Sequence, residues 1–125
     1  MTTSVPKRFQ LGPGAAGLVK NIYGDRLAVA GGSTQTIVSY TILPNKKFYV
    51  ALIEFNGGNI GYYEIYVNSV LQAYKYTSYA GPYYGDFFLN NLPLVAGDVV
   101  ELRATNIQSY PADYHGRILG VEEDV

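Results

Sequence analysis

Short apolar runs separated by turn residues fill most of the chain from Leu18 onward. Runs rich in Val, Ile and Tyr alternate with Gly, Asn and Pro roughly every eight to twelve residues, and none keeps the 3.6-residue apolar repeat of a helix. This spacing is typical of antiparallel sandwiches and barrels. We therefore expect about eight or nine strands. They are placed near residues 18–23, 26–30, 35–42, 47–56, 60–67, 70–78, 85–89, 98–105 and 114–121.

The clearest local element is a hairpin that turns at Asn68 and Ser69. Two apolar runs meet at this pair, and Asn in the first position of a two-residue loop favours a primed turn, because Asn tolerates positive φ. Pairing counted outward from the turn places Tyr63 opposite Tyr74 and Tyr62 opposite Lys75.

The two faces of this hairpin are expected to differ in character. One face is predicted to enter the core, and it carries Tyr63, Ile65, Val67, Val70, Tyr74 and Tyr76. The other is predicted to be half-exposed, and it carries Tyr62, Glu64, Tyr66, Leu71 and Lys75. Rings beside an opposite-charge pair are favoured at protein interfaces, so we predict a subunit interface at Tyr62, Tyr66, Leu71 and Lys75. A plain sheet surface and a platform for a sugar or other small ligand remain alternatives.

A second tyrosine-rich segment, "SYAGPYYGD" at residues 78–86, is broken by Gly and Pro and is predicted to be a loop. Its three rings cannot all reach one small core, and loop aromatics of this kind commonly meet a partner. The predicted partner or glycan residues are Tyr79, Tyr83, Tyr84 and Asp86.

The length of 125 residues suits one domain with a single core. Residues 1–17 are poor in apolar groups and rich in Thr, Ser, Pro and Gly, so we expect a flexible N-terminal arm there and a β-sandwich over 18–125.

Charge and cysteine content exclude several classes of partner. Charged residues make up 15% of the chain and the formal net charge is -1, so no basic stripe is present to bind nucleic acid or an anionic membrane surface. With no cysteine, disulfides and thiolate metal sites are excluded. No apolar run has the length of a signal peptide or a membrane span, so we expect no secretory signal and no membrane insertion.

The sequence offers little for catalysis. His115 is the single histidine, no G-x-S-x-G motif is present, and carboxylates such as Asp98 and Glu101 are spaced as solvent-facing strand residues. We interpret His115 as a hydrogen-bonding residue at a strand edge. The glycines of "GPGAAG" lack the Lys-Ser/Thr ending of a phosphate loop. We therefore expect no enzyme activity, no metal and no cofactor.

Four stretches of the chain resemble small jelly-roll accessory domains of tailed-bacteriophage virions. They run from Leu43 to Glu54, Gly61 to Ser78, Asn91 to Asn106 and Gly116 to Gly120, and include "KFYV", "GYYEIYVNSV", "YKYTS", "AGDVVELRATN" and "GRILG". Ser69 departs from the pattern, which has Gly after the turn Asn. The resemblance implies an antiparallel jelly-roll sandwich of about eight strands.

The same resemblance implies a role in the virion. Such domains decorate capsids as cement proteins, often as trimers, or form parts of tail fibres and baseplates that attach to host carbohydrate. We expect a capsid decoration protein that is made in the host cytoplasm and binds the major capsid protein and its own copies. Lys7, Arg8 and Phe9 are the predicted capsid anchors in the arm. The alternative is a carbohydrate-binding module for host attachment.

Overall fold

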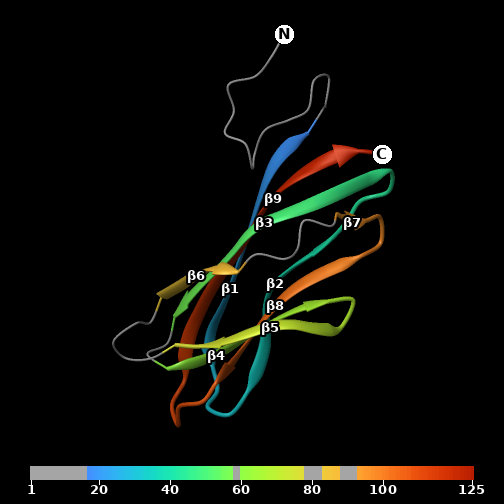
Figure 1. Ribbon diagram of the computed structural model, residues 1–125. Helices are drawn as coiled ribbons and strands as arrows, with labels where there is room; N and C mark the ends of the chain where they lie inside the picture. The colour runs from blue at the N-terminus through green and yellow to red at the C-terminus, as the bar shows by residue number, and fades with distance from the viewer. Residues whose placement is uncertain (1–16, 58–59, 78–82, 88–92) are drawn as a thin grey trace.

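The computed structural model describes residues 17–57, 60–77, 83–87 and 93–125, which form nine strands and no helix (Figure 1). The strands are β1 (Leu18–Val29), β2 (Thr34–Thr41), β3 (Lys46–Gly57), β4 (Gly61–Val67), β5 (Val70–Tyr76), β6 (Tyr83–Phe87), β7 (Leu94–Val95), β8 (Val99–Asn106) and β9 (Ala112–Asp124). Apart from Gly17, the predicted arm lies outside the described residues.

Two antiparallel sheets form the sandwich. One has the order β1-β9-β3-β6, with the two-residue β7 also paired to β3, and the other has the order β2-β8-β4-β5. If the short β7 is left out, β8 and β9 become the seventh and eighth strands along the chain. The first sheet then has the strand order one, eight, three, six, and the second has the order two, seven, four, five. This is the jelly-roll arrangement, and the predicted all-β sandwich is confirmed. Figure 1 shows the strands of each sheet running side by side.

Strict alternation of side chains builds the core. In β8, Val100, Leu102 and Ala104 point inward and are fully buried, whereas Glu101 and Arg103 between them point outward. Across the sandwich, the ring of Phe55 stacks on Tyr63 with centroids 4.1 Å apart. Such interdigitated aliphatic and aromatic side chains hold the two sheets together.

One carboxylate, that of Glu122, is buried between the sheets and is 4% exposed. It accepts a hydrogen bond from the hydroxyl of Tyr40 on the opposite sheet, and the Nζ atom of Lys20 lies 3.5 Å from it. Burial and the bond to Glu122 raise the pKa of Tyr40 to about 12. A buried charge requires such partners, so Tyr40 and Lys20 compensate for the desolvation of Glu122.

The predicted turn between β4 and β5 is confirmed. Asn68 and Ser69 both have positive φ, at 50° and 66°, as a type I′ turn requires. The side chain of Asn68 also accepts from the backbone N–H of Val99 at 2.9 Å and donates to Asp98 at 3.0 Å. These bonds fasten the turn to the start of β8.

The predicted register of this hairpin is wrong beyond its first pairs. Tyr66 faces Leu71 as expected, but the next pair is Ile65 with Ala73, so Gln72 is an extra residue on β5. Because side chains alternate between the two faces of a strand, this bulge moves every side chain after Gln72 to the face opposite its predicted one. Tyr74 and Tyr76, which were predicted for the core, are therefore exposed. Val70 was also predicted for the core and is exposed too, although it precedes the bulge and keeps its predicted pairing with Val67.

The first two predicted strands are one continuous strand, β1. Gly24, which lies between the two predicted strands, is inside β1. The backbone of β2 passes close to it, so a Cβ atom at Gly24 would lie 2.0 Å from the carbonyl oxygen of Ile37. The Nε of Arg26 donates to the carbonyl of Thr36 at 2.9 Å nearby. Glycine at this position lets the edges of the two sheets meet.

Candidate binding surfaces

The outer side of β4 and β5 carries a cluster of half-buried and exposed tyrosine rings with one leucine. We call it the tyrosine face, and it consists of Tyr62, Tyr66, Leu71, Tyr74 and Tyr76. The ring centroid of Tyr62 lies 4.7 Å from that of Tyr76 and 5.7 Å from that of Tyr74. The Tyr62 hydroxyl donates to Glu64 at 3.2 Å. Desolvation and then the charge of Glu64 raise the pKa of Tyr62.

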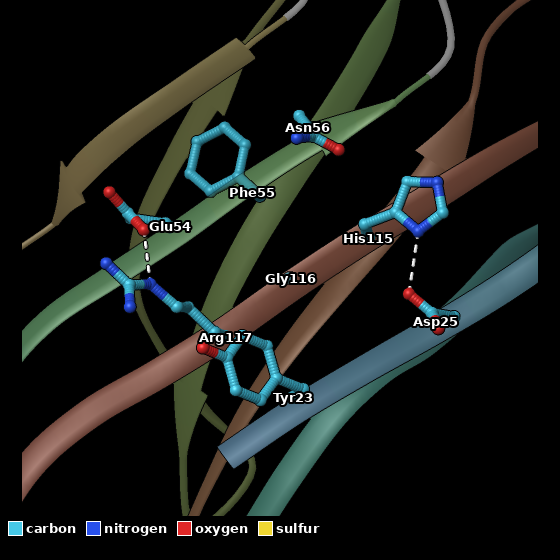
Figure 2. Close-up of a pocket in the computed structure, with 8 residues that line it drawn as sticks. All are labelled: Tyr23, Asp25, Glu54, Phe55, Asn56, His115, Gly116 and Arg117. Carbon is cyan, nitrogen blue, oxygen red and sulfur yellow. Dashed lines mark hydrogen bonds and ion pairs between the residues drawn. The ribbon is translucent and has the colours of Figure 1, made fainter. Parts of the chain in front are cut away.

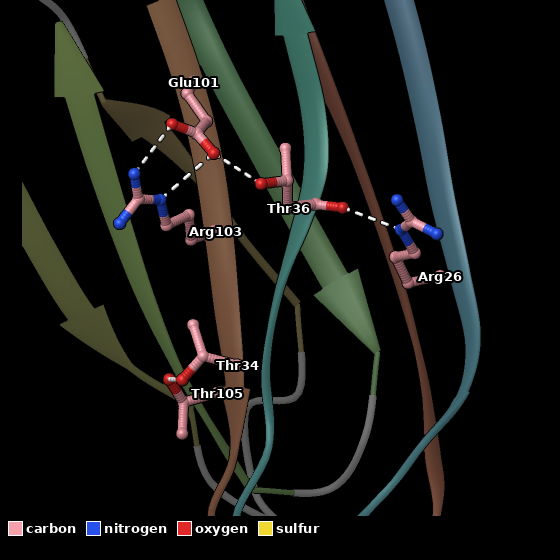
Figure 3. Close-up of polar contacts among 6 residues, drawn as sticks. All are labelled: Arg26, Thr34, Thr36, Glu101, Arg103 and Thr105. Carbon is pink, nitrogen blue, oxygen red and sulfur yellow. Dashed lines mark hydrogen bonds and ion pairs between the residues drawn. The ribbon is translucent and has the colours of Figure 1, made fainter. Parts of the chain in front are cut away.

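Charged side chains of β8 border this face. The guanidinium of Arg103 lies over the ring of Tyr66 and donates two hydrogen bonds of 3.0 Å to Glu101. Thr36 of β2 also donates to Glu101, as Figure 3 shows. The hydrogen bonds from Arg103 and Thr36 lower the pKa of Glu101, with Arg103 the larger cause. The border is therefore a fixed ionic network beside flat apolar rings.

Three of the four predicted interface residues share this face. Tyr62, Tyr66 and Leu71 lie together on it, but Lys75 does not. Lys75 pairs with Tyr63, whose side chain is fully buried, so Lys75 leaves β5 on the inward side of the ribbon. The bulge at Gln72 is the cause, because it shifts Lys75 from its predicted place opposite Tyr62.

The other predicted residues lie elsewhere or outside the described part. Lys7, Arg8, Phe9 and Tyr79 lie outside the described residues. The prediction of a loop at Tyr83 and Tyr84 is wrong, because they belong to β6, which also contains Asp86. The backbones of Tyr83 and Tyr84 pair with Asn56 and Phe55 of β3. This pairing satisfies backbone groups at the edge of β3 that a loop would leave open.

A hollow on the outer face of the opposite sheet was not foreseen from the sequence. It has a volume of about 290 Å³ and is open to solvent. Six outward side chains surround it, two from each of the strands β1, β9 and β3 (Figure 2). We call this set the polar hollow, and it consists of Tyr23, Asp25, His115, Arg117, Glu54 and Asn56.

The six side chains form two rows across the strands. Strand pairing puts Asp25, His115 and Asn56 in one row, and Tyr23, Arg117 and Glu54 in the other. Gly116 and Phe55 lie between the rows; Phe55 is buried, so the floor there is backbone.

Each row of the polar hollow contains a polar contact between side chains of two strands. The Nδ1 of His115 lies 2.6 Å from a carboxylate oxygen of Asp25, and the Nε of Arg117 donates to Glu54. Hydrogen bonding to Glu54, the largest cause, raises the pKa of Arg117. His115 lies on β9, which is flanked by β1 and β3. The interpretation of His115 as a hydrogen-bonding residue holds, but its placement at a strand edge was wrong.

A repeated local signal marks these residues in the sequence. Each strand carries two polar or tyrosine residues separated by one residue: Tyr23 and Asp25, Glu54 and Asn56, His115 and Arg117. The spacing shows that each pair shares a face. Only the pairing of the three strands brings the pairs together, and that pairing joins segments far apart in the chain.

No family model and no curated protein sequence matches the chain. In the described ranges, no group of three or more His, Cys, Asp or Glu side chains is arranged to hold a metal ion. The same part of the chain contains no helix with the length and apolarity to cross a membrane.

Proposed function

We propose that this chain is a non-enzymatic virion structural protein of a tailed bacteriophage. It decorates the capsid as a cement protein, binding the major capsid protein and its own copies as a homotrimer. The observation that supports this most is the exposure of strand β5. The resemblance of the sequence to jelly-roll accessory domains of virions supports the location.

Strand β5 is the outermost strand of its sheet and exposes much apolar surface. On its outer side the exposed fraction is 44% for Leu71, 59% for Tyr74 and 58% for Tyr76. Edge strands of soluble proteins are usually short, charged or covered, because an uncovered apolar edge invites association. A contiguous exposed apolar patch on such an edge marks an interaction surface.

A second copy of the chain is the partner that the tyrosine face fits best. Rigid tyrosine rings cover area with little loss of rotamer entropy. Glu64 and Arg103 provide opposite charges beside these rings, so a neighbouring copy can match charge with charge. The arm is then left for the capsid, where Lys7, Arg8 and Phe9 act as anchors.

Light scattering and co-sedimentation with phage capsids test this function. We expect a mass three times the 13.7 kDa of the chain, and sedimentation with capsids that is lost when residues 1–17 are deleted. Replacing Tyr74 and Tyr76 by Ser is expected to yield a monomer. Tyr23→Ser, on the other sheet, is the matched control and should remain a trimer. A wild-type monomer that ignores capsids would contradict the proposal.

A further inference from the structure

The polar hollow has the size and outline of a site for one small ring. Residues two apart on a strand are separated by roughly 6.7 Å, which sets the distance between the two rows. Three neighbouring strands span roughly 10 Å, which sets the length of the rows. The volume of about 290 Å³ lies at the low end of ligand sites. The polar hollow therefore suits a single six-membered ring rather than a large cofactor.

Its charges disfavour simple ions of either sign. Asp25 and Glu54 carry negative charge and Arg117 carries positive charge, so both signs of charge lie within the rows. An anion such as phosphate would face two carboxylates, and a cation would face the guanidinium of Arg117. A neutral ligand avoids both repulsions.

The hydrogen-bonding groups of the polar hollow are mixed in kind. Carboxylates accept, the guanidinium donates, and the Asn56 amide does both. The bond to Glu54 uses one of the five N–H donors of Arg117. A ligand with several hydroxyl groups matches this mixture, because each hydroxyl both donates and accepts.

An aromatic ring stands at one end of the rows. Tyr23 is 69% exposed, and its hydroxyl accepts a hydrogen bond of 2.9 Å from Asn21, which holds the side chain in place. Figure 2 shows the ring beside Arg117 at the border of the polar hollow. An exposed ring next to polar groups provides an apolar surface for the C–H face of a ligand. The His115–Asp25 contact and the Arg117–Glu54 ion pair fix the polar side chains before any ligand binds, which reduces the entropy lost on binding.

From these features we propose that the polar hollow binds one neutral pyranose unit of a saccharide. The ring lies between the two rows, with one face on Tyr23 and its hydroxyls on Asp25, Asn56 and Arg117. This activity goes beyond capsid decoration and does not depend on it, since the polar hollow and the tyrosine face lie on different sheets.

Titration of the full chain with methyl pyranosides, followed by amide NMR shifts, tests the proposal. The probes are the methyl glycosides of glucose, galactose, mannose and N-acetylglucosamine, with glucuronic acid as the anionic comparison. We expect at least one neutral sugar to shift the amides of His115, Gly116 and Arg117, and glucuronic acid to bind more weakly. Tyr23→Ala and Asn56→Ala should each weaken binding about tenfold.

Val19→Ala is the matched control, because it shortens an exposed apolar side chain on the same strand as Tyr23 but outside the polar hollow. It should leave sugar binding unchanged, and equal melting temperatures would show that all three variants are folded. Absence of shifts with every neutral sugar, shifts confined to the tyrosine face, or binding that survives both Tyr23→Ala and Asn56→Ala would overturn the proposal. None of these results bears on capsid sedimentation, so the two proposals fail separately.

Discussion

Arg103 on β8 holds Tyr66 on β4 in place: its guanidinium carbon lies 4.0 Å from the centroid of the Tyr66 ring. The same guanidinium is fixed from the other side by Glu101. A planar group held by a carboxylate and stacked on a ring loses little further freedom on binding a partner. This geometry keeps the border of the tyrosine face rigid.

Replacing Arg103 by Lys should lower the free energy of unfolding by about 1 kcal/mol, because lysine retains the charge but neither stacks flat nor forms the paired hydrogen bonds. Urea unfolding measures the change. A double-mutant cycle with Tyr66→Leu isolates the ring contact, and we expect a coupling of about 0.5 kcal/mol. Strict additivity of the two changes would show that the stacking contributes nothing.

Replacing Glu101 by Gln should make the protein less sensitive to acid. Arg103 lowers the pKa of Glu101 below its usual 4.5, so the folded state favours the ionised carboxylate. The resulting stabilisation is complete above pH 4.5 and is lost as the pH falls through the lowered pKa. Unfolding by urea at about pH 7 and about pH 3 should therefore differ less in Glu101→Gln than in wild type. An equal loss of stability in both proteins would contradict this.

Replacing Tyr40 by Phe should destabilise the protein by about 1.5 kcal/mol at neutral pH, because Glu122 loses a hydrogen bond while it remains buried. The pKa of Tyr40 is raised from 10.0 to about 12, so its contribution is complete below pH 10 and is lost as the pH rises through 12.

Wild type and Tyr40→Phe should thus converge in stability above about pH 11, as measured by urea unfolding. Tyr74→Phe, which removes the hydroxyl of an exposed ring, is the control and should match wild type at neutral pH. A difference between wild type and Tyr40→Phe that persists unchanged at high pH would rule out this linkage.

Replacing Ser69 by Gly should raise the free energy of unfolding by up to about 1 kcal/mol. Ser69 has a φ of 66°, a left-handed conformation that costs an L-residue about this much and glycine almost nothing. Ser39→Gly, at an exposed position inside β2, should destabilise instead, since glycine gains no conformational advantage there. Thermal or urea unfolding of both variants gives the sign, and destabilisation by Ser69→Gly would show that other contacts of Ser69 dominate.

Replacing Gly24 by Ala should lower the free energy of unfolding by about 3 kcal/mol or prevent folding, because the new methyl group meets the carbonyl oxygen of Ile37. Gly32→Ala is the comparison: it carries a strained φ of 79° but meets no atom within 4 Å, so its cost should be near 1 kcal/mol. Equal melting temperatures for the two variants would show that β1 and β2 can move apart without a loss of stability.

Local patterns were enough to predict the turn at Asn68 and Ser69, because its geometry depends on two adjacent residues. They were also enough for the sandwich and for most of its strands. The apolar alternation of β3 and β8 reflects directly which side chains are buried.

The bulge at Gln72 and the polar hollow could not be predicted in this way. The bulge depends on how β5 pairs with β4, and one extra residue places both Tyr74 and Lys75 on the face opposite to the predicted one. The pairing of Asp25 with His115 joins residues 90 positions apart. No local window contains both partners, so only the fold reveals the pair.

The position of β9 between β1 and β3 has a consequence for synthesis on the ribosome. Every strand from β1 to β8 emerges first, yet β1 and β3 have no common neighbour until Ala112–Asp124 has been translated. Pairings between such distant segments form slowly, and the unpaired edges of β1 and β3 are prone to aggregation until β9 pairs with them. Chains interrupted before β9 should therefore accumulate as insoluble protein, whereas chains that include it close the first sheet in a single late step.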